Sequence, residues 1–328
     1  MADNRALVMG ANGFLGSHIT QQLVEAGQPV TAFVRANSDT RSIDPLDVPR
    51  VHGDIMDKDS LRAALQAIDV VYYCIVDTRA WLKDTSPLYR TNIDGLRNVL
   101  DVATELSVKK FVFTSSIVTI GLNPKGIVTE EDEFNWYDKA PDYVRCRAQA
   151  ERMVFEYHKK HQLPAVALCV ANTYGPGDIQ PTPHGALIRN VAYEETSLPI
   201  DCHNPVVDIR DAATAMILAS EKGRDGERYI IASDHAHQIT LFNHAADVAG
   251  VPRPKLNLSI RQLYVIAFIA QTFNKLRGIR TSLNIESVLL SHIFCEMDCS
   301  KAKTELGWQP RPIKESISDA VEFYLAHP

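Results

Sequence analysis

The stretch Leu7–Ile19, LVMGANGFLGSHI, places an apolar strand, a glycine turn and a helix start in immediate succession. Its three glycines have the spacing G-x-x-G-x-x-G, and each meets a separate need: a tight turn, close approach of backbone to a pyrophosphate, and close packing of helix on strand. The positive end of the helix, with its unpaired N–H groups, faces the same phosphates. The stretch therefore predicts a dinucleotide-binding βαβ fold. The residues expected at the pyrophosphate are Gly10, Gly13, Phe14, Leu15 and Gly16.

Beyond this turn, short β-branched runs alternate with longer amphipathic stretches, which is the pattern of parallel strands joined by crossover helices. The fold class expected is α/β, a Rossmann-type doubly wound parallel sheet. Strands are expected over Ala6–Met9, Pro29–Val34, Arg50–Asp54, Val70–Val76, Lys110–Ser115 and Ala165–Ala171. Helices are expected to begin near Phe14, Ser60, Pro87, Asp142 and Gly185.

The proline- and glycine-rich text GPGDIQPTPHG, residues 175–185, marks the place where the chain leaves this sheet. Regular patterns return at Val206–Ser220 and Arg228–Ala232, so two lobes are expected to exchange segments. We expect a dinucleotide-binding domain over residues 1–174, completed by about 203–234. A smaller, discontinuous carboxyl-terminal substrate lobe is expected over 175–202 and 235–328.

Composition excludes several classes of protein. Hydrophobic residues make up 45% and charged residues 23% of the 328, as in a folded globular chain. A net charge of -6 gives no basic surface for nucleic acid. Six cysteines without paired C-x-x-C spacing, and His235 and His237 without a third ligand nearby, predict no metal site.

The termini and one apolar run bear on location. The first residues, MADNRALVMG, do not read as a secretory leader, so a cytoplasmic protein is expected. The run Leu263–Phe273, LYVIAFIAQTF, is well short of the roughly 20 residues that cross a bilayer, so no membrane span is expected. A buried helix is the favoured interpretation of this run, and a lid over a lipophilic substrate is the alternative.

The end of the second strand bears on the choice of dinucleotide. NAD-selective sites carry an acid there for the ribose 2′-hydroxyl, whereas this chain has Arg35, which can pair with a 2′-phosphate, and Arg41 nearby could assist. NADP(H) is therefore favoured over NAD(H), with a solvated surface arginine as the alternative. Asp54, followed by Ile55 in the same predicted cofactor set, is placed to accept from the adenine amino group, although aspartate there also commonly caps a loop.

The motifs GANGFLGSHI, FVR, GDIMD, TNIDGLRNVL, FVFTSS and YGPGD occur in this order, and with DCSKAKTELGWQPRP near the carboxyl end they span nearly the whole chain. Together they resemble the extended short-chain dehydrogenase/reductase superfamily, NAD-dependent epimerase/dehydratase type. DTRAWLKDTSPLYRTN, GPGDIQPTPHG and GERYIIAS are most similar to the branch of dihydroflavonol reductases, 3β-hydroxysteroid dehydrogenases and hopanoid-associated sugar epimerases.

The resemblance implies catalysis by serine, tyrosine and lysine. Ser116 matches the serine that hydrogen-bonds the substrate oxygen, and Tyr143 matches the proton donor or acceptor. A tyrosine with a pKa near 10 needs a nearby cation to work near neutral pH, and position 147 shares its helix face. Arg147 stands there in place of the family lysine. It keeps the charge and the reach to ribose hydroxyls, but it cannot release a proton, so the family's proton relay is in doubt.

One further stretch and one further residue can be compared with the residues that the family carries at the same places. In VVYYCIV, the residues Tyr73–Val76 replace a histidine and small residues beside the cofactor, which could narrow the nicotinamide side of the cleft. Asn92 matches a helix asparagine that we expect to brace the strand carrying Ser116.

The favoured function is an NADP(H)-dependent oxidoreductase that reduces a ketone or aldehyde, or oxidises a secondary alcohol, of a fairly apolar small molecule. One alternative is a nucleotide-sugar epimerase or dehydratase with tightly held NAD, for which Arg210 is the only arginine offered in HNPVVDIRD. Another is a dinucleotide-binding protein with attenuated catalysis. The resemblance also implies a homodimer formed through a pair of helices.

Overall fold

The computed structural model describes residues 4–79, 84–123, 126–195, 199–255, 258–277 and 285–327. Its main element is a seven-stranded sheet of order β3-β2-β1-β4-β5-β6-β9, parallel throughout. This confirms the expected fold class. The strands are β1 (Ala6–Met9), β2 (Val30–Val34), β3 (Arg50–His52), β4 (Val70–Tyr73), β5 (Lys110–Ser116), β6 (Ala165–Val170) and β9 (Arg228–Ile231).

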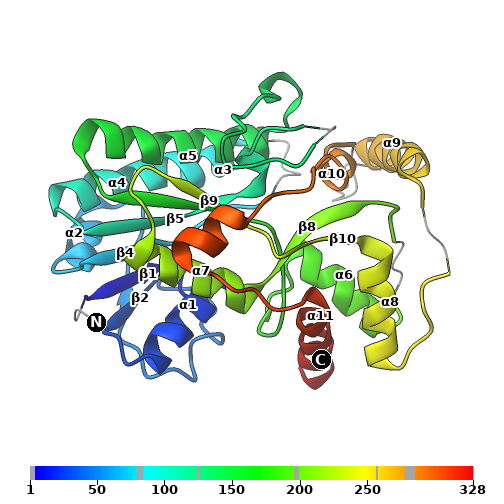
Figure 1. Ribbon diagram of the computed structural model, residues 1–328, viewed down its shortest axis with the longest axis horizontal. Coiled ribbons are helices and arrows are strands. Elements are labelled where there is room, and N and C mark those ends of the chain that lie inside the picture. Colours follow the sequence, from blue (N-terminus) through cyan, green and yellow to red (C-terminus); the bar gives the residue numbers. More distant parts are fainter. Residues whose placement is uncertain are drawn as a thin grey trace.

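Helices cover both faces of this sheet (Figure 1). On one face lie α1 (Phe14–Glu25) and α7 (Ile209–Lys222), and on the other lie α2 (Lys58–Leu65), α4 (Leu96–Glu105) and α5 (Asp142–His161). Successive strand residues point to opposite faces, so Ala6 and Val8 join one core while Leu7 and Met9 join the other. Both faces are buried, which is why these strands read as continuous apolar runs.

A second sheet of order β10-β8-β7 forms beside the first, from β7 (Asn172–Tyr174), β8 (His203–Asp208) and β10 (Asp234–His237). The helices α6 (Pro183–Ala192), α8 (Gln238–Ala249) and α11 (Ile313–Ala326) pack against it in a separate core. Within the segment 203–234, β8 belongs to this small sheet, whereas α7 and β9 join the large one. The exact lobe bounds stay a prediction.

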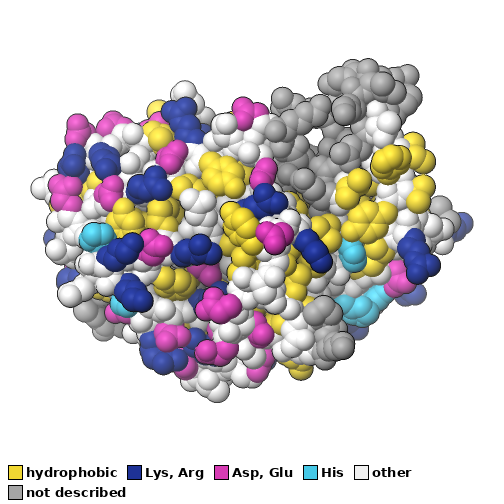
Figure 2. Space-filling view, turned by 90° about the horizontal axis from the view of Figure 1, so that it is seen from above, with side chains coloured by type: hydrophobic (Ala, Val, Ile, Leu, Met, Phe, Trp, Pro, Cys, Tyr) yellow, Lys and Arg dark blue, Asp and Glu magenta, His cyan; other side chains and the backbone are white. Residues whose placement is uncertain are grey.

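The apolar run near the carboxyl end lies in α9 (Ile260–Arg277), which is followed by α10 (Ile285–Leu290). Leu263 and Ala267 are buried, but Val265, Phe268 and Ile269 are 59–61% exposed, so the buried-helix interpretation is wrong for this face. Figure 2 shows hydrophobic side chains gathered in this part of the surface. Within the described ranges, no helix combines the length and apolar character needed to cross a bilayer.

The remaining elements connect these layers. They are the short helix α3 (Ser86–Tyr89), a π-helical turn over Arg90–Gly95, and single turns over Ile117–Thr119, Tyr137–Lys139 and Ala302–Leu306.

Candidate active site

A cavity of about 920 Å³ lies at the carboxyl ends of the central strands of the large sheet, where doubly wound folds bind ligands. Its walls come from both halves of the chain. One end is formed by the glycine turn after β1, and the middle by the ends of β5 and β6 and the start of α5. The far end is formed by β7, α6, α9 and α10, so the cavity joins the two lobes.

The glycine turn has the geometry of a phosphate cradle. Gly10 has a φ of +80°, and a Cβ on Gly16 would lie 2.2 Å from the Gly10 carbonyl oxygen, so neither position accepts a side chain without strain. The Gly13 side of the turn lines the cavity together with Phe14, Leu15 and Gly16. No side chain caps α1, which leaves its first N–H groups for a ligand. The turn therefore fits a dinucleotide pyrophosphate.

The residues expected to choose between dinucleotides lie outside the cavity lining. Arg35 is exposed after β2, and its guanidinium makes no hydrogen bond or ion pair with the described part of the chain, whereas its carbonyl oxygen accepts from the Ser38 N–H at 3.0 Å. Arg41 instead forms a bidentate ion pair with Asp39, in which its Nη2 lies 2.6 Å from the carboxylate. This contact holds the pKa of Asp39 well below its usual range. Asp39 lines the cavity and also accepts a hydrogen bond from Gln180 at 3.1 Å.

Asp54 makes the local contact that a loop cap makes: its carboxylate accepts from the backbone N–H of Met56 at 2.9 Å. Ile55 is buried, and its side chain approaches Gly95 so closely that a Cβ there would lie 2.3 Å from it. The adenine and ribose roles of Arg35, Asp54 and Ile55 stay predictions.

Ser116, Tyr143 and Arg147 all line the middle of the cavity. Ser116 is the last residue of β5, and its Oγ accepts from the N–H of Val118 at 3.4 Å. Tyr143 lies in the first turn of α5 and lines the same part of the cavity as Ser116. Burial raises the pKa of Tyr143 above its usual value, while Arg147 and Ser116 oppose the rise. The phenol is therefore held in its protonated form and is suited to donate a proton.

Arg147 is a buried cation, only 2% exposed. Its Nη2 donates to the carbonyl oxygen of Thr114, and its Cζ lies 5.2 Å from the centre of the Phe113 ring. Its Nε has no hydrogen-bond partner among the described residues. Arg147 is also the sole lysine or arginine of the cavity lining, as far as the structure describes it.

The residues Tyr73–Val76, which differ from the family pattern, lie partly in the core and partly at the cavity. Tyr73 stacks on Phe111 and Phe113 at ring distances of 5.9 and 6.0 Å and is buried in the sheet face. Cys74 and Val76 line the cavity.

The expected role of Asn92 is wrong. Its amide exchanges two hydrogen bonds with the backbone of Asp77, at 2.8 and 2.9 Å, so it braces the segment after β4, not the strand that carries Ser116. The segment 80–83 that follows, part of the stretch quoted for the resemblance, lies outside the described residues.

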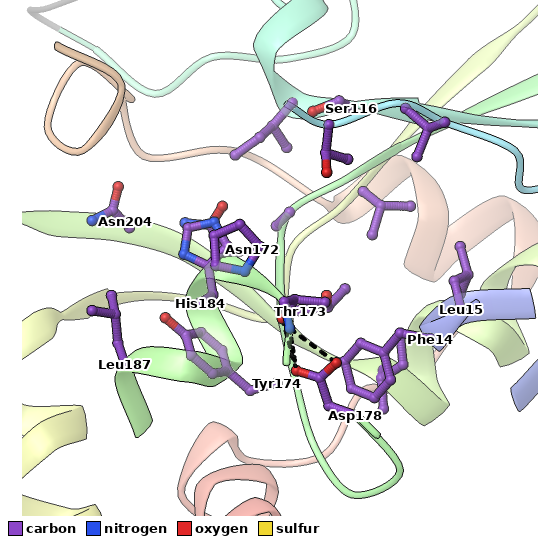
Figure 3. Close-up of a pocket in the computed structure, with 18 of the residues that line it drawn as sticks. Phe14, Leu15, Ser116, Asn172, Thr173, Tyr174, Asp178, His184, Leu187 and Asn204 are labelled. Atoms are coloured by element: carbon purple, nitrogen blue, oxygen red, sulfur yellow. Dashed lines mark hydrogen bonds between the residues drawn. The ribbon is translucent and has the colours of Figure 1, made fainter. Parts of the chain in front are cut away.

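Sequence reasoning missed the polar residues at the far end of the cavity. Figure 3 shows Asn172, His184 and Asn204 around the cavity, on the side away from Phe14 and Leu15. Only His184 lies in the text GPGDIQPTPHG, which predicts a loop, whereas Asn172 begins β7 and Asn204 lies in β8. The mixture of proline with polar residues in that text was the one available signal.

The histidines near β10 lie together outside this cavity. The ring centre of His203 is 5.5 Å from that of His235 and 4.5 Å from that of His237, whose Nε2 lies 3.0 Å from the carboxylate of Asp201. Across the described residues, no group of three or more metal-ligating side chains is placed to hold an ion.

Comparison with known proteins agrees with this geometry. The model of the NAD dependent epimerase/dehydratase family matches residues 6–232. The chain belongs to this family. It thereby belongs to the extended short-chain dehydrogenase/reductase superfamily, an assignment that confirms the resemblance and makes the protein a nicotinamide-dinucleotide enzyme.

Similar proteins align over nearly the full length. The chain is 28% identical to sterol demethylase protein B of Methylococcus capsulatus, covering 97% of each chain. It is 28% identical to a 2-alkyl-3-oxoalkanoate reductase of Stenotrophomonas maltophilia, over 94% of this chain and 95% of the other. The crystal structure of gox2253 superposes with a TM-score of 0.88 at 29% identity, covering 99% of this chain and 98% of that one.

Proposed function

We propose that this protein is an NADP(H)-dependent oxidoreductase that reduces a ketone, or oxidises the corresponding secondary alcohol, of an uncharged and largely apolar molecule. The observation that carries the proposal is the cavity itself. It brings Ser116 and Tyr143 together beside the glycine turn, and its far half is walled mainly by aliphatic side chains. Relatives named for sterol demethylation and for reduction of 2-alkyl-3-oxoalkanoates support an apolar substrate.

The charge of the cavity argues against a nucleotide-sugar substrate. A second diphosphate, beyond the one that the glycine turn fits, would be paired with arginine or lysine, and the described lining offers Arg147 alone. Arg210, the arginine of HNPVVDIRD that a diphosphate would need, does not line the cavity. Its Nη2 lies 2.7 Å from the Asp208 carboxylate and 2.6 Å from that of Asp319.

In the reduction, each side chain has one task. A bound nicotinamide dinucleotide supplies the hydride. Ser116 donates a hydrogen bond to the substrate carbonyl oxygen and orients it, and Tyr143 passes its phenolic proton to that oxygen as negative charge develops there. Arg147 stays protonated, and its positive charge stabilises the phenolate that Tyr143 becomes after it has given up its proton.

The test is consumption of NADPH, followed by nicotinamide absorbance, with a panel of apolar ketones and the variant Tyr143→Phe. Phenylalanine preserves the packing of Tyr143 but removes the proton, so kcat/KM is expected to fall about 100- to 10,000-fold while NADPH still binds. Tyr137→Phe, at a tyrosine that is 53% exposed, is the matched control and should keep full activity. A Tyr143→Phe enzyme with undiminished turnover would refute the assigned role.

A further inference from the structure

His184 presents a polar ring to the cavity and finds no partner for it in the described protein. It lies in the first turn of α6, and its ring packs edge-on against Tyr174 with centres 6.1 Å apart. Its nitrogens make no hydrogen bond with any described residue, and the ring lines the cavity. Burial lowers its pKa to about 4, so at neutral pH the imidazole offers one N–H donor and one acceptor.

The walls at this end of the cavity combine a majority of apolar side chains with a few polar ones. Asn172 and Asn204 line this end of the cavity as well, and the Oδ1 of Asn204 is buried without a hydrogen-bond partner in the described chain. Most of the remaining far wall comes from aliphatic residues, including Leu187, Leu241, Leu263, Ile266, Val288 and Leu290. The buried, unpaired Oδ1 of Asn204 is costly in such surroundings, and the half-buried ring of His184 opens onto the same cavity, so a ligand that pairs with both accounts for their retention.

The turn that carries His184 is held rigidly in place. The buried Asp178 accepts hydrogen bonds from the N–H and Oγ1 of Thr182, the cap of α6, and from the hydroxyl of Tyr324 on α11. Gly185 completes the fit, because a Cβ there would lie 2.0 Å from the Asp178 carboxylate and 2.4 Å from the Tyr324 hydroxyl. The imidazole is therefore positioned by a buried network and not by a free loop.

We propose that His184 is a specificity-determining residue that hydrogen-bonds a second, uncharged oxygen of the substrate, a hydroxyl or carbonyl distant from the reacting carbon. This rests on the proposed function and narrows its substrate class to bifunctional ketones with an apolar skeleton. A carboxylate or phosphate at this position is disfavoured, because no lysine or arginine of the described lining other than Arg147 could neutralise it.

The experiment compares 2-undecanone with the set of its monohydroxy derivatives. Each is measured for kcat/KM with NADPH and, separately, for affinity by calorimetric titration in the presence of NADP+. We expect at least one hydroxyketone to exceed 2-undecanone about tenfold in both quantities, the size expected for one buried hydrogen bond with its desolvation penalty. His184→Phe keeps an aromatic ring but removes both nitrogens, so this ratio should fall to about one. His184→Gln keeps a donor and an acceptor and should retain part of the preference.

The outcomes separate the two proposals. A wild-type enzyme with no preference for any hydroxyketone, or a preference that survives His184→Phe, overturns the role of His184. Binding with a His184-dependent preference but no turnover overturns the proposed reaction and supports the contact. Failure of every ketone both to bind and to react overturns both.

Discussion

Arg35→Ser is expected to weaken NADPH binding while leaving NADH binding nearly unchanged. Arg35 follows the last buried residue of β2, and its exposed guanidinium has no partner in the described chain. It is thus available to a 2′-phosphate on the adenosine ribose, which only NADPH carries. Serine removes the cation without introducing a charge that would repel either dinucleotide.

The size of the effect follows from the exposure of Arg35. A hydrogen-bonded charge pair contributes about 1.5–3 kcal/mol when sheltered, and solvent screening at an exposed side chain reduces this to roughly 1–2 kcal/mol. With tenfold in Kd for each 1.4 kcal/mol, the NADPH Kd should rise about 5- to 30-fold. Because the contact is solvent-exposed, the difference should shrink at high ionic strength.

Titration of both dinucleotides by calorimetry measures this directly, and Arg41→Ser is the matched control. Arg41 already pairs with Asp39, so its loss should affect NADPH much less than the loss of Arg35 does. The reasoning fails if Arg35→Ser weakens NADPH and NADH equally, or if the wild-type protein shows no preference for NADPH.

Three further outcomes test the site. Gly16→Ala places a methyl group 2.2 Å from the Gly10 carbonyl oxygen and should lower the unfolding free energy by about 1–3 kcal/mol and weaken dinucleotide binding, measured by thermal melting and titration. Gly27→Ala is its control: with φ +67° and no atom within 4 Å of its Cβ, it should cost only backbone strain and leave dinucleotide affinity unchanged. Because the raised pKa of Tyr143 favours the phenol, the rate of ketone reduction should not change with pH up to about 10. The rate of alcohol oxidation, which needs the phenolate, should rise with pH over the same range. A fall in the reduction rate near pH 7 would contradict this. Arg147→Met removes the described cation of the cavity and should lower kcat/KM for reduction about 100-fold, with Arg147→Lys restoring most of it.

The large sheet could be predicted because its signals are local. The glycine turn and the apolar runs fix six of its strands within a few residues, and only their ends differ: β3 stops at His52 and β4 at Tyr73. The small sheet could not be predicted in the same way. Its strand Asn172–Tyr174 has no apolar run, and the run in β8 does not reveal which sheet it joins, because pairing depends on residues distant in sequence.

The residues of the candidate site also differ in whether local sequence signals predict them. Ser116 and Tyr143 can be named as candidates from the sequence because they match family motifs, and both line the cavity, while their catalytic roles stay predictions. His184 could not be predicted from the sequence, because its place at the cavity depends on the hydrogen bonds that Asp178 makes with Thr182 and with Tyr324, near the carboxyl end of the chain. Asn92 was assigned to the wrong strand for a related reason, since the motif fixes the residue but not its partner.

The two departures from the family pattern are connected in space. A guanidinium is longer and flatter than an ammonium group, and it is stabilised by lying over an aromatic face. Arg147 lies over Phe113, and Tyr73 stacks on that same Phe113 at 6.0 Å. Tyr73 thus packs against the same Phe113 ring that Arg147 contacts. The smaller residues Cys74 and Val76, which follow Tyr73, form the cavity wall. Arginine at position 147 and tyrosine at position 73 therefore act as one structural unit that fixes a permanent positive charge beside Tyr143.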